Sequence, residues 1–391
     1  DQLMRIIGNN PAADNAEITA VASGTLPSGQ SVIVNADGTV SVVAETAVAQ
    51  SLGTAATFKT STPGSPDSVY DAGTNRVVIV YGDPSDGDKG KAIVGTVSGT
   101  DISFGSQVVF NAGTTGAKSV TYDSASEKVV IAYKDAGNSS YGTAIVGTVS
   151  GTTISFGSEV VFASATIVEI KSTFDSASNK VVISYIDQDN SNYGIAIVGT
   201  VSGTSISFGT AAVWNSNRSD FTSIAFDSSA NKVVITFASA TGSPSYEGKA
   251  IVGTVSSTNI SYASAVVFES GRTENTSVVY EANAQKVVIA YKDRGNSSYG
   301  TAIVGTISGT SISFGTAVVF DSSNSEAFST DFDASNNTVV IAYHHGQSGK
   351  GYLIAGTVSG TNISFATRLE FRAGGGDGTS IDYNSTEEKS V

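Results

Sequence analysis

The phrase AIVGTVSGT, or a close variant of it, occurs six times along this chain of 391 residues. The copies follow one another at about 52 residues, and their central glycines are Gly95, Gly147, Gly199, Gly253, Gly305 and Gly356. A sequence that repeats at such a period forms one structural unit per repeat, because each unit must bury its apolar face against the next. The repeat therefore constrains the architecture more than any single motif does.

One repeat, residues 119–162, contains four short apolar or alternating runs that are separated by polar turns. The runs are rich in Val, Ile, Tyr and Phe and are bounded by Ser, Gly, Asn or Asp, which is typical of β-strands. None of them shows the 3.6-residue period of a helix. Four antiparallel strands per repeat predict an all-β chain folded as a β-propeller, with one blade per repeat.

The repeats predict six full blades over roughly residues 67–371. We expect a seventh blade to be assembled from both ends of the chain, with residues 379–391 as the first strand and the start of the second, and residues 31–60 as the third and fourth. Such pairing would remove exposed strand edges. Six blades with a separate N-terminal hairpin is the alternative. Residues 1–30 fit no blade and are interpreted as a linker or attachment arm, and both ends of the sequence as fragment ends.

Composition narrows the class of partner. The formal net charge of −14 and the pI near 4.5 predict that the chain does not bind nucleic acid, because an acidic protein repels phosphates. The absence of cysteine excludes disulfides and thiolate metal sites, and suits a protein that works outside a cell. No apolar run reaches the length of a membrane-spanning helix, so we predict no membrane insertion.

The repeats differ from one another mainly in two groups of segments. The turns between strands one and two, and between strands three and four, hardly change, whereas the loops between strands two and three and the connections between blades vary widely. In a propeller these two groups lie on opposite faces, so we predict that the variable face binds a ligand. Solvated loops that vary without consequence are the alternative.

Three loops of the variable face share the pattern Asp-x-x-Asn-x-x-Tyr. These side chains are suited to hydrogen bonds with sugar hydroxyls and to stacking on a sugar ring. The alternative is structural: Asp and Asn cap turns, and Tyr packs against the loop. With two arginines of the blade connections, the predicted ligand-binding residues are Asp135, Asn138, Tyr141, Asp187, Asn190, Tyr193, Asp293, Asn296, Tyr299, Arg218 and Arg272.

Calcium is the one cofactor that the sequence suggests. Asp83, Asp86 and Asp88 lie close together in one loop, and carboxylate oxygens are ligands for Ca²⁺. No other cofactor is expected. The aromatic residues at fixed blade positions, and Trp214 in place of one of them, are interpreted as packing between blades.

Little in the sequence points to catalysis. The chain has only two histidines, His344 and His345, which we interpret as loop residues in solvent, and it has no cysteine nucleophile. Carboxylates are plentiful, but most recur at equivalent positions, such as Asp71, Asp123, Asp175, Asp227 and Asp333. A repeated residue indicates a structural role, so we predict that the protein is not an enzyme. A paired-carboxylate glycan-degrading enzyme is the alternative.

The phrases VVIAYKD and GNSSYGTAIVGTVSGT, with VNADGTVS near the N-terminus, resemble those of repeat-rich proteins of marine tailed phages, particularly cyanophages. The resemblance covers roughly residues 31–391. It implies a virion-surface protein of the tail-fibre or adhesin type, or a structural or decoration protein. Its partners would be a host cell-surface glycan or receptor and, through the N-terminal arm, other virion proteins.

The chain is more faintly similar to sialidase-type propellers. Their Asp-box turn has its equivalent here in Ser-Gly-Thr-x-Ile-Ser-Phe, but most copies lack the aspartate, and the arginine trio of those enzymes is not identifiable. This departure argues against sialidase activity. The function expected from the sequence is non-enzymatic binding of a host surface glycan or protein through the variable loops.

Overall fold

The computed structural model describes residues 3–7, 17–22, 32–34, 39–42, 51–240, 246–374 and 378–391. The chain divides into two compact units, Asp1–Gln50 and Ser51–Val391. Strands make up most of the described residues, and the helices among them are two short 3-10 turns, η1 (Pro84–Asp86) and η2 (Arg294–Asn296). Within this part of the chain, no helix has the length and apolar character needed to cross a membrane.

The N-terminal unit is a small sheet with the strand order β1-β2-β4-β3. Its strands are β1 (Leu3–Ile7), β2 (Glu17–Ala22), β3 (Val32–Val34) and β4 (Thr39–Val42). The prediction that residues 31–43 pair with the C-terminal strands is therefore wrong, because β4 pairs with β3 and β2 instead. Pairing between neighbours closes a short loop, whereas pairing with residues 383–390 would close a loop through nearly the whole chain. The unit also extends beyond the predicted arm of residues 1–30.

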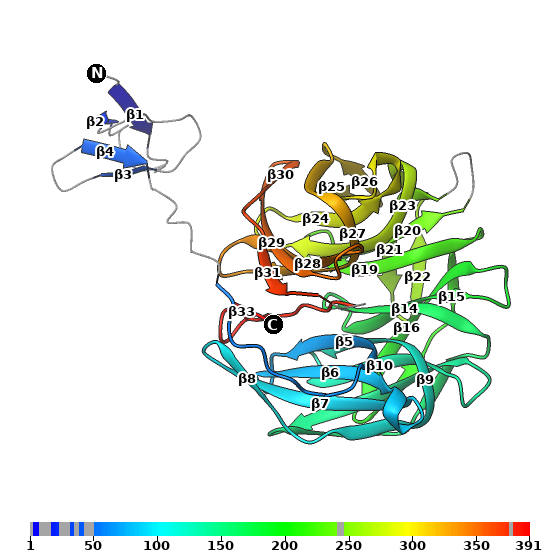
Figure 1. Ribbon diagram of the computed structural model, residues 1–391. Helices are drawn as coiled ribbons and strands as arrows, with labels where there is room; N and C mark the ends of the chain where they lie inside the picture. Colours follow the sequence, from blue (N-terminus) through cyan, green and yellow to red (C-terminus); the bar gives the residue numbers. More distant parts are fainter. Residues whose placement is uncertain are drawn as a thin grey trace. The chain divides into compact units, whose positions relative to one another are not determined.

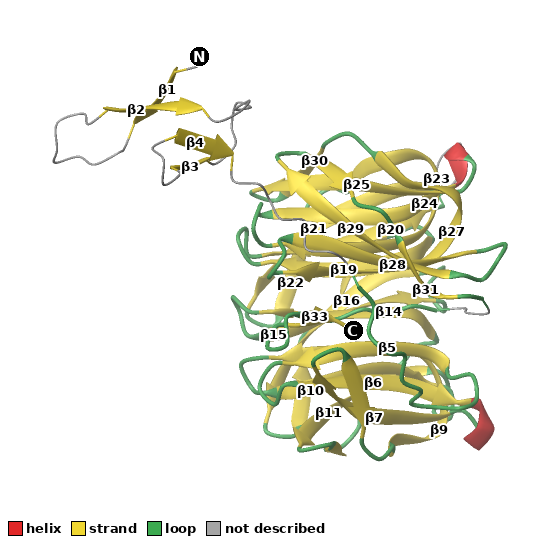
Figure 2. Ribbon diagram, turned by 60° about the vertical axis from the view of Figure 1, so that its left-hand side comes forward, coloured by secondary structure: helices red, strands yellow, loops and turns green. Residues whose placement is uncertain are grey.

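The second unit, Ser51–Val391, consists of six four-stranded antiparallel blades followed by a short C-terminal hairpin (Figures 1 and 2). Strands β9, β23 and β27 each begin as the outermost strand of one blade and end as the innermost strand of the next. The strands of the first three blades are β5 (Gly64–Asp71), β6 (Arg76–Asp83), β7 (Lys89–Ser98), β8 (Asp101–Phe104), β9 (Val108–Asp123), β10 (Lys128–Asp135), β11 (Tyr141–Ser150), β12 (Thr153–Phe156), β13 (Val160–Ala163), β14 (Ile167–Asp175), β15 (Lys180–Asp187), β16 (Tyr193–Ser202), β17 (Ser205–Phe208) and β18 (Ala212–Asn215). Those of the remaining blades and the hairpin are β19 (Ser219–Asp227), β20 (Lys232–Ser239), β21 (Glu247–Ser256), β22 (Asn259–Tyr262), β23 (Val266–Glu281), β24 (Lys286–Asp293), β25 (Tyr299–Ser308), β26 (Ser311–Phe314), β27 (Val318–Asp333), β28 (Thr338–His345), β29 (Gly351–Ser359), β30 (Asn362–Phe365), β31 (Leu369–Arg372), β32 (Tyr383–Asn384) and β33 (Lys389–Ser390).

The second strand of each blade contains an unbroken Val-Val-Ile run because it is buried on both faces between neighbouring blades. In the second blade, Val129, Val130 and Ile131 are fully buried. In the first five blades, the aromatic residue near the end of the blade packs against the next blade: the ring centre of Phe110, for example, lies 5.2 Å from that of Tyr133. Trp214 packs likewise, 4.7 Å from Phe237, so the predicted inter-blade role is confirmed for these five aromatics. The sixth, Phe371, is 40% exposed.

The repeated aspartates cap the turns between the first and second strands. Asp123 Oδ1 accepts hydrogen bonds from the backbone N–H groups of Ala125 and Ser126, both at 3.0 Å. Equivalent bonds are made at Asp71, Asp175, Asp227 and Asp333. These carboxylates satisfy turn amides, which confirms their predicted structural role.

A partial seventh blade lies between the sixth blade and the first. The N–H of Ile381 donates to Ser329 Oγ of the sixth blade at 3.1 Å, and the N–H of Ser68 in the first donates to Ser380 Oγ at 3.2 Å. On the outer side, Phe58 lies 5.5 Å from Tyr81, as Phe110 lies on Tyr133. Residues 55–58 thus take the predicted place of a fourth strand, but residues 51–57 form no strand, and no third strand of this blade is present among the described residues.

Candidate functional site

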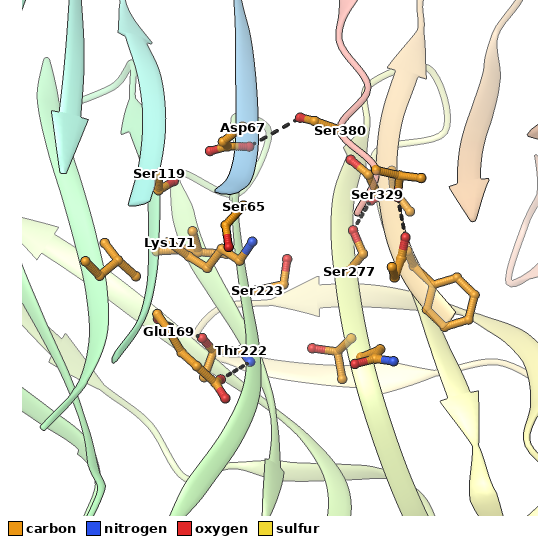
Figure 3. A pocket seen from close by; sticks show the side chains of 18 of the residues that line it. Ser65, Asp67, Ser119, Glu169, Lys171, Thr222, Ser223, Ser277, Ser329 and Ser380 are labelled. Carbon is orange, nitrogen blue, oxygen red and sulfur yellow. Dashed lines mark hydrogen bonds between the residues drawn. The ribbon is translucent and has the colours of Figure 1, made fainter. Parts of the chain in front are cut away.

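The innermost strands of the blades surround a central channel with a cavity of about 460 Å³ (Figure 3). Every blade, the partial seventh included, contributes to its wall. The lining comprises residues 65–68, 117–120, 169–172, 221–224, 275–278, 327–330 and 379–381.

The pairing register of the innermost strand shifts at an equivalent place in all six blades, and in five of them the irregularity is a β-bulge in which one residue adopts a positive φ. These residues are Ser65 (φ 41°), Glu169 (51°), Phe221 (58°), Asn275 (52°) and Ala327 (51°). A positive φ costs a non-glycine residue about 1 kcal/mol, and bulges re-aim side chains. All five residues line the channel, so the same type of bulge places five different side chains at one cavity.

The bulges lie toward the end of the channel that opens on the variable face. In the third blade, Val168 pairs with Ile186 and Ile167 with Asp187, where the loop between the second and third strands begins. At the other end of the same strand pair, Asp175 faces Lys180 beside the uniform turn. The channel mouth and the variable loops therefore belong to the same face.

Glu169 is the most distinctive group at this mouth. Its Oε2 accepts a hydrogen bond of 2.9 Å from the N–H of Thr222, which lies in the next blade. Burial raises the pKa of Glu169 to about 7, while that hydrogen bond acts in the opposite direction. Near neutral pH the carboxyl group is therefore partly protonated and partly ionised. The protonated form can donate a hydrogen bond, and both forms can accept one.

Hydroxyl groups line the channel wall between the blades. Ser119 Oγ and Ser172 Oγ are 3.0 Å apart, and Ser277 Oγ and Thr330 Oγ1 are 2.9 Å apart. Figure 3 shows serines from several innermost strands around one space, with Lys171 and Glu169 beside them. With the Phe221 ring and the Asn275 amide, the mouth offers donors, acceptors and one aromatic face.

We predict that the stability contribution of Glu169 depends on pH. Its ordinary pKa is 4.5 and its folded pKa is about 7, so between these values the folded protein binds more protons than the unfolded one. Stability then falls as pH rises through this window and stays lower above it. Glu169→Gln should therefore gain roughly 3 kcal/mol over the wild type between pH 4 and pH 8. The measurement is chemical unfolding of both proteins at each pH, and a difference that does not change with pH would contradict the assignment.

The structure places the predicted loop residues at the periphery of this face, and it shows what their carboxylates do. Asp135 Oδ1 accepts from the N–H groups of Gly137 and Asn138, and Asp187 and Asp293 cap their loops in the same way. The three tyrosines, Tyr141, Tyr193 and Tyr299, pair with these aspartates across the hairpin and are half-buried. Only the asparagines, Asn138, Asn190 and Asn296, are exposed at all three loops. Ligand binding by these residues stays a prediction, whereas the turn-capping alternative is seen directly.

The two predicted arginines are exposed and paired within their own connections. Arg218 Nε lies 2.9 Å from Asp220 Oδ2, and a guanidinium nitrogen of Arg272 lies 2.8 Å from Glu274 Oε1. Arg272 also lies over the ring of Tyr246, with 5.2 Å from Cζ to the ring centre. Neither lines the channel cavity.

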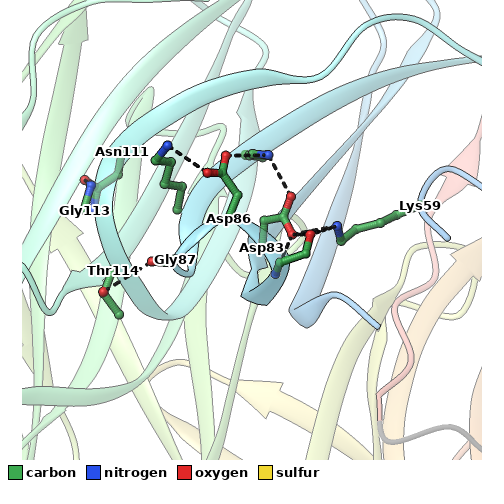
Figure 4. Close-up of polar contacts among 10 residues, drawn as sticks. Lys59, Asp83, Asp86, Gly87, Asn111, Gly113 and Thr114 are labelled. Atoms are coloured by element: carbon green, nitrogen blue, oxygen red, sulfur yellow. Dashed lines mark hydrogen bonds and ion pairs between the residues drawn. The ribbon is translucent and has the colours of Figure 1, made fainter. Parts of the chain in front are cut away.

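Lysines engage two of the carboxylates that were proposed as a calcium site (Figure 4). Asp83 lies 2.6 Å from Lys59 Nζ and 2.7 Å from Lys91 Nζ, and Asp86 lies 2.9 Å from the ammonium groups of both Lys89 and Lys91. The lysines hold the pKa of Asp83 well below its usual range. The residues that the structure describes contain no group of three or more acidic or histidine side chains able to hold a metal ion, so the proposed Asp83, Asp86 and Asp88 site is wrong. The lysine charges take the place that a cation would need.

The histidines do not lie in a solvated loop, as the sequence suggested. They end strand β28, where His344 is 6% exposed. His345 Nε2 lies 2.6 Å from Asp321 Oδ2, which also accepts from Arg368 at 2.8 Å. Strand β28 continues for two residues beyond its apolar run, and this extension places both histidines against neighbouring residues.

No known protein family matches the chain, and no curated protein matches it. Among solved structures, it is similar to the β-propeller domain of Cps50 (Swd1) from Myceliophteria thermophila, with a TM-score of 0.50 and 9% identity over 83% of this chain and 91% of that one. It is also similar to a protein from Lactobacillus plantarum, with a TM-score of 0.57 and 11% identity over 91% of this chain and 96% of that one. These likenesses support the β-propeller fold, and at such identities they carry nothing about function.

The bulge residues were missed in the sequence, although a signal for them exists. Each lies five residues before the aromatic that ends the first strand of its repeat. At that position the six repeats carry Ser65, Ala117, Glu169, Phe221, Asn275 and Ala327, a wider range of chemistry than a structural position tolerates. Variation inside a strand, and not only in loops, was the signal.

Proposed function

We propose that the protein is a non-enzymatic binding module that takes up a surface glycan at the channel mouth of its variable face. The observation that carries the proposal is the set of bulges: a repeated strained backbone that presents Ser65, Glu169, Phe221, Asn275 and Ala327 to one cavity. Backbone strain often clusters at binding sites, and bulges re-aim side chains toward them. Hydroxyl, amide and carboxyl groups beside one aromatic ring fit a polyhydroxylated ligand.

The resemblance to marine phage proteins supports a biological setting for this binding. In that setting the module lies on the virion surface, as a tail-fibre or adhesin-type protein outside the cell, and its ligand is a host surface glycan or receptor. The N-terminal unit, Asp1–Gln50, would contact other virion proteins. A structural or decoration role on the particle is the alternative within the same setting.

Binding of the purified, labelled full chain to candidate host cells tests the proposal. We expect saturable binding that is lost after the surface polysaccharide has been stripped. Saturable binding that survives stripping would favour a protein receptor. Absence of binding to any host would contradict the adhesin and favour the decoration role.

Glu169 favours one second candidate, a glycan-degrading enzyme. A carboxyl whose pKa is raised to about 7 by burial is suited to act as a general acid. Such an enzyme needs a second carboxylate near the scissile bond. Release of reducing ends from host polysaccharide, lost in Glu169→Gln, would support the enzyme, and intact polysaccharide at high protein concentration would count against it.

A further inference from the structure

Lys171 differs from the residues at its position in the other blades of the channel wall. It lies two residues after the bulge, where the other innermost strands carry Asp67, Ser119, Ser223, Ser277 and Ser329. Those five side chains are short and end in oxygen atoms, whereas Lys171 is long and ends in an ammonium group. Ser119, Ser223 and Ser277 are buried, but Lys171 is exposed in the channel.

The oxygen atoms at this position join neighbouring blades. Ser119 Oγ of the second blade accepts a hydrogen bond of 3.0 Å from the N–H of Ser172 in the third. Equivalent bonds run from the N–H groups of Val120 to Asp67, Val278 to Ser223 and Ile381 to Ser329. An ammonium group has no acceptor atom, so Lys171 cannot accept the corresponding bond from the N–H of Ile224 in the fourth blade. The third blade therefore lacks one bond between blades and has a cation in the channel instead.

The other charged groups of the channel lining are engaged with the protein. Asp67 and Glu169 each accept a bond of 2.9 Å from a backbone N–H of the next blade. Burial raises the pKa of Glu169 more than the charge of Lys171 lowers it. Lys118 is 7% exposed and donates to two backbone carbonyls of the first blade, at 3.0 and 3.2 Å. Within the described part of the chain Lys171 forms no ion pair, so its charge is open to a ligand.

We propose that Lys171 binds an anionic group of the glycan, a carboxylate, a sulfate ester or a phosphate ester, inside the channel. This inference rests on the proposed function, because it names the class of glycan that the channel mouth takes up. Figure 3 shows the Lys171 side chain extending into the space between the innermost strands. The hydroxyl groups of Ser65 and Ser223, which line the same cavity, can donate further hydrogen bonds to the anion.

Charge makes this position selective. Hydrogen bonds from an ammonium group to an anion are stronger than bonds between neutral groups. The chain has a formal net charge of −14, so most of its surface repels an anion. An exposed cation inside the channel would therefore direct an anionic glycan to the channel and away from the rest of the protein.

Titration of the full chain with a neutral hexose oligosaccharide and with its carboxylated, sulfated and phosphorylated derivatives tests the proposal. We expect at least one derivative to bind at least tenfold more tightly than the neutral form, and Lys171→Ser to abolish this difference. The three derivatives distinguish the three anionic groups. Equal affinity for the neutral and anionic forms, or a preference that survives in Lys171→Ser, would overturn the proposal and leave glycan binding itself intact.

Inorganic sulfate and phosphate test the anion site without a glycan. At constant ionic strength, a millimolar concentration of one of these anions should raise the melting temperature of the wild type more than that of Lys171→Ser. This result without binding of any oligosaccharide would support the anion site and contradict the proposed function. Equal stabilisation of both proteins would overturn the anion site.

The melting temperature of Lys171→Ser without ligand tests the comparison between blades. We expect it to exceed the wild-type value, because serine can accept the bond from the N–H of Ile224, so weaker anion binding would not reflect a lost fold. A lower melting temperature would overturn the proposal, since Lys171 would then have a structural role. Lys180→Ser is the matched control: it removes the same charge beside the uniform turn of the same strand pair and should keep the preference for the anionic derivative.

Discussion

Gly194→Ala is expected to destabilise the propeller by about 3 kcal/mol. A Cβ at this position would lie 2.3 Å from the Trp214 ring, far closer than a real contact. The ring cannot move aside, because it is buried, packs 4.7 Å from Phe237 and donates from Nε1 to Ser184 Oγ at 3.2 Å. Thermal unfolding of the full chain measures the effect.

Gly64→Ala is the matched control. Its added Cβ would meet only backbone atoms of Gly82 at 3.6 Å or more, which is ordinary contact. We expect the free energy of unfolding of this variant to lie within about 1 kcal/mol of the wild-type value. If Gly194→Ala and Gly64→Ala unfold at the same temperature, the close packing of the third-strand glycine against the fourth-strand aromatic does not stabilise the blades as described.

The double variant Phe221→Ala, Glu169→Ala is expected to lose about 100-fold in affinity for the host polysaccharide. A stacked aromatic ring and a hydrogen bond to a partly ionised carboxyl group together contribute about 3 kcal/mol to binding. Each step of about 1.4 kcal/mol corresponds to a factor of ten in affinity. Both side chains project from bulges in neighbouring blades into the same cavity. Titration of polysaccharide fragments into each protein gives the affinities.

Tyr141→Ala with Tyr193→Ala provides the comparison, because these tyrosines belong to the loops that the sequence favoured. If the glycan binds at the channel mouth, we expect the affinity of this variant to change threefold or less. A loss of affinity in the tyrosine variant alone would show that the glycan binds at the loops. The Asp-x-x-Asn-x-x-Tyr pattern would then mark the binding site in the sequence. Circular dichroism of each variant shows whether the fold is retained.

The periodicity of the sequence was enough to predict the blades. AIVGTVSGT and the buried Val-Val-Ile runs mark strands whose partners are close in the chain, so local pairing decides their place. The seventh blade was harder, because its strands would have to come from distant segments. Residues 379–391 and Phe58 take the expected positions, whereas β3 and β4 pair with their own neighbours.

The candidate site depended on features that single positions do not reveal. Asp83 and Asp86 suggested calcium, but Lys59, 24 residues before Asp83, lies against it in the fold. The bulge at Glu169 depends on a register shift between two strands, which local sequence does not specify. Comparison of equivalent positions across the repeats was the one sequence method that could have found it.

Hydrogen exchange of the full chain, with and without host polysaccharide fragments, locates the glycan on the protein. If the glycan binds at the channel mouth, we expect new protection at residues 169–171, 221–222 and 275–276, from three neighbouring blades. Protection confined to the loops at 135–141, 187–193 and 293–299, or no protection under saturating ligand, would contradict it.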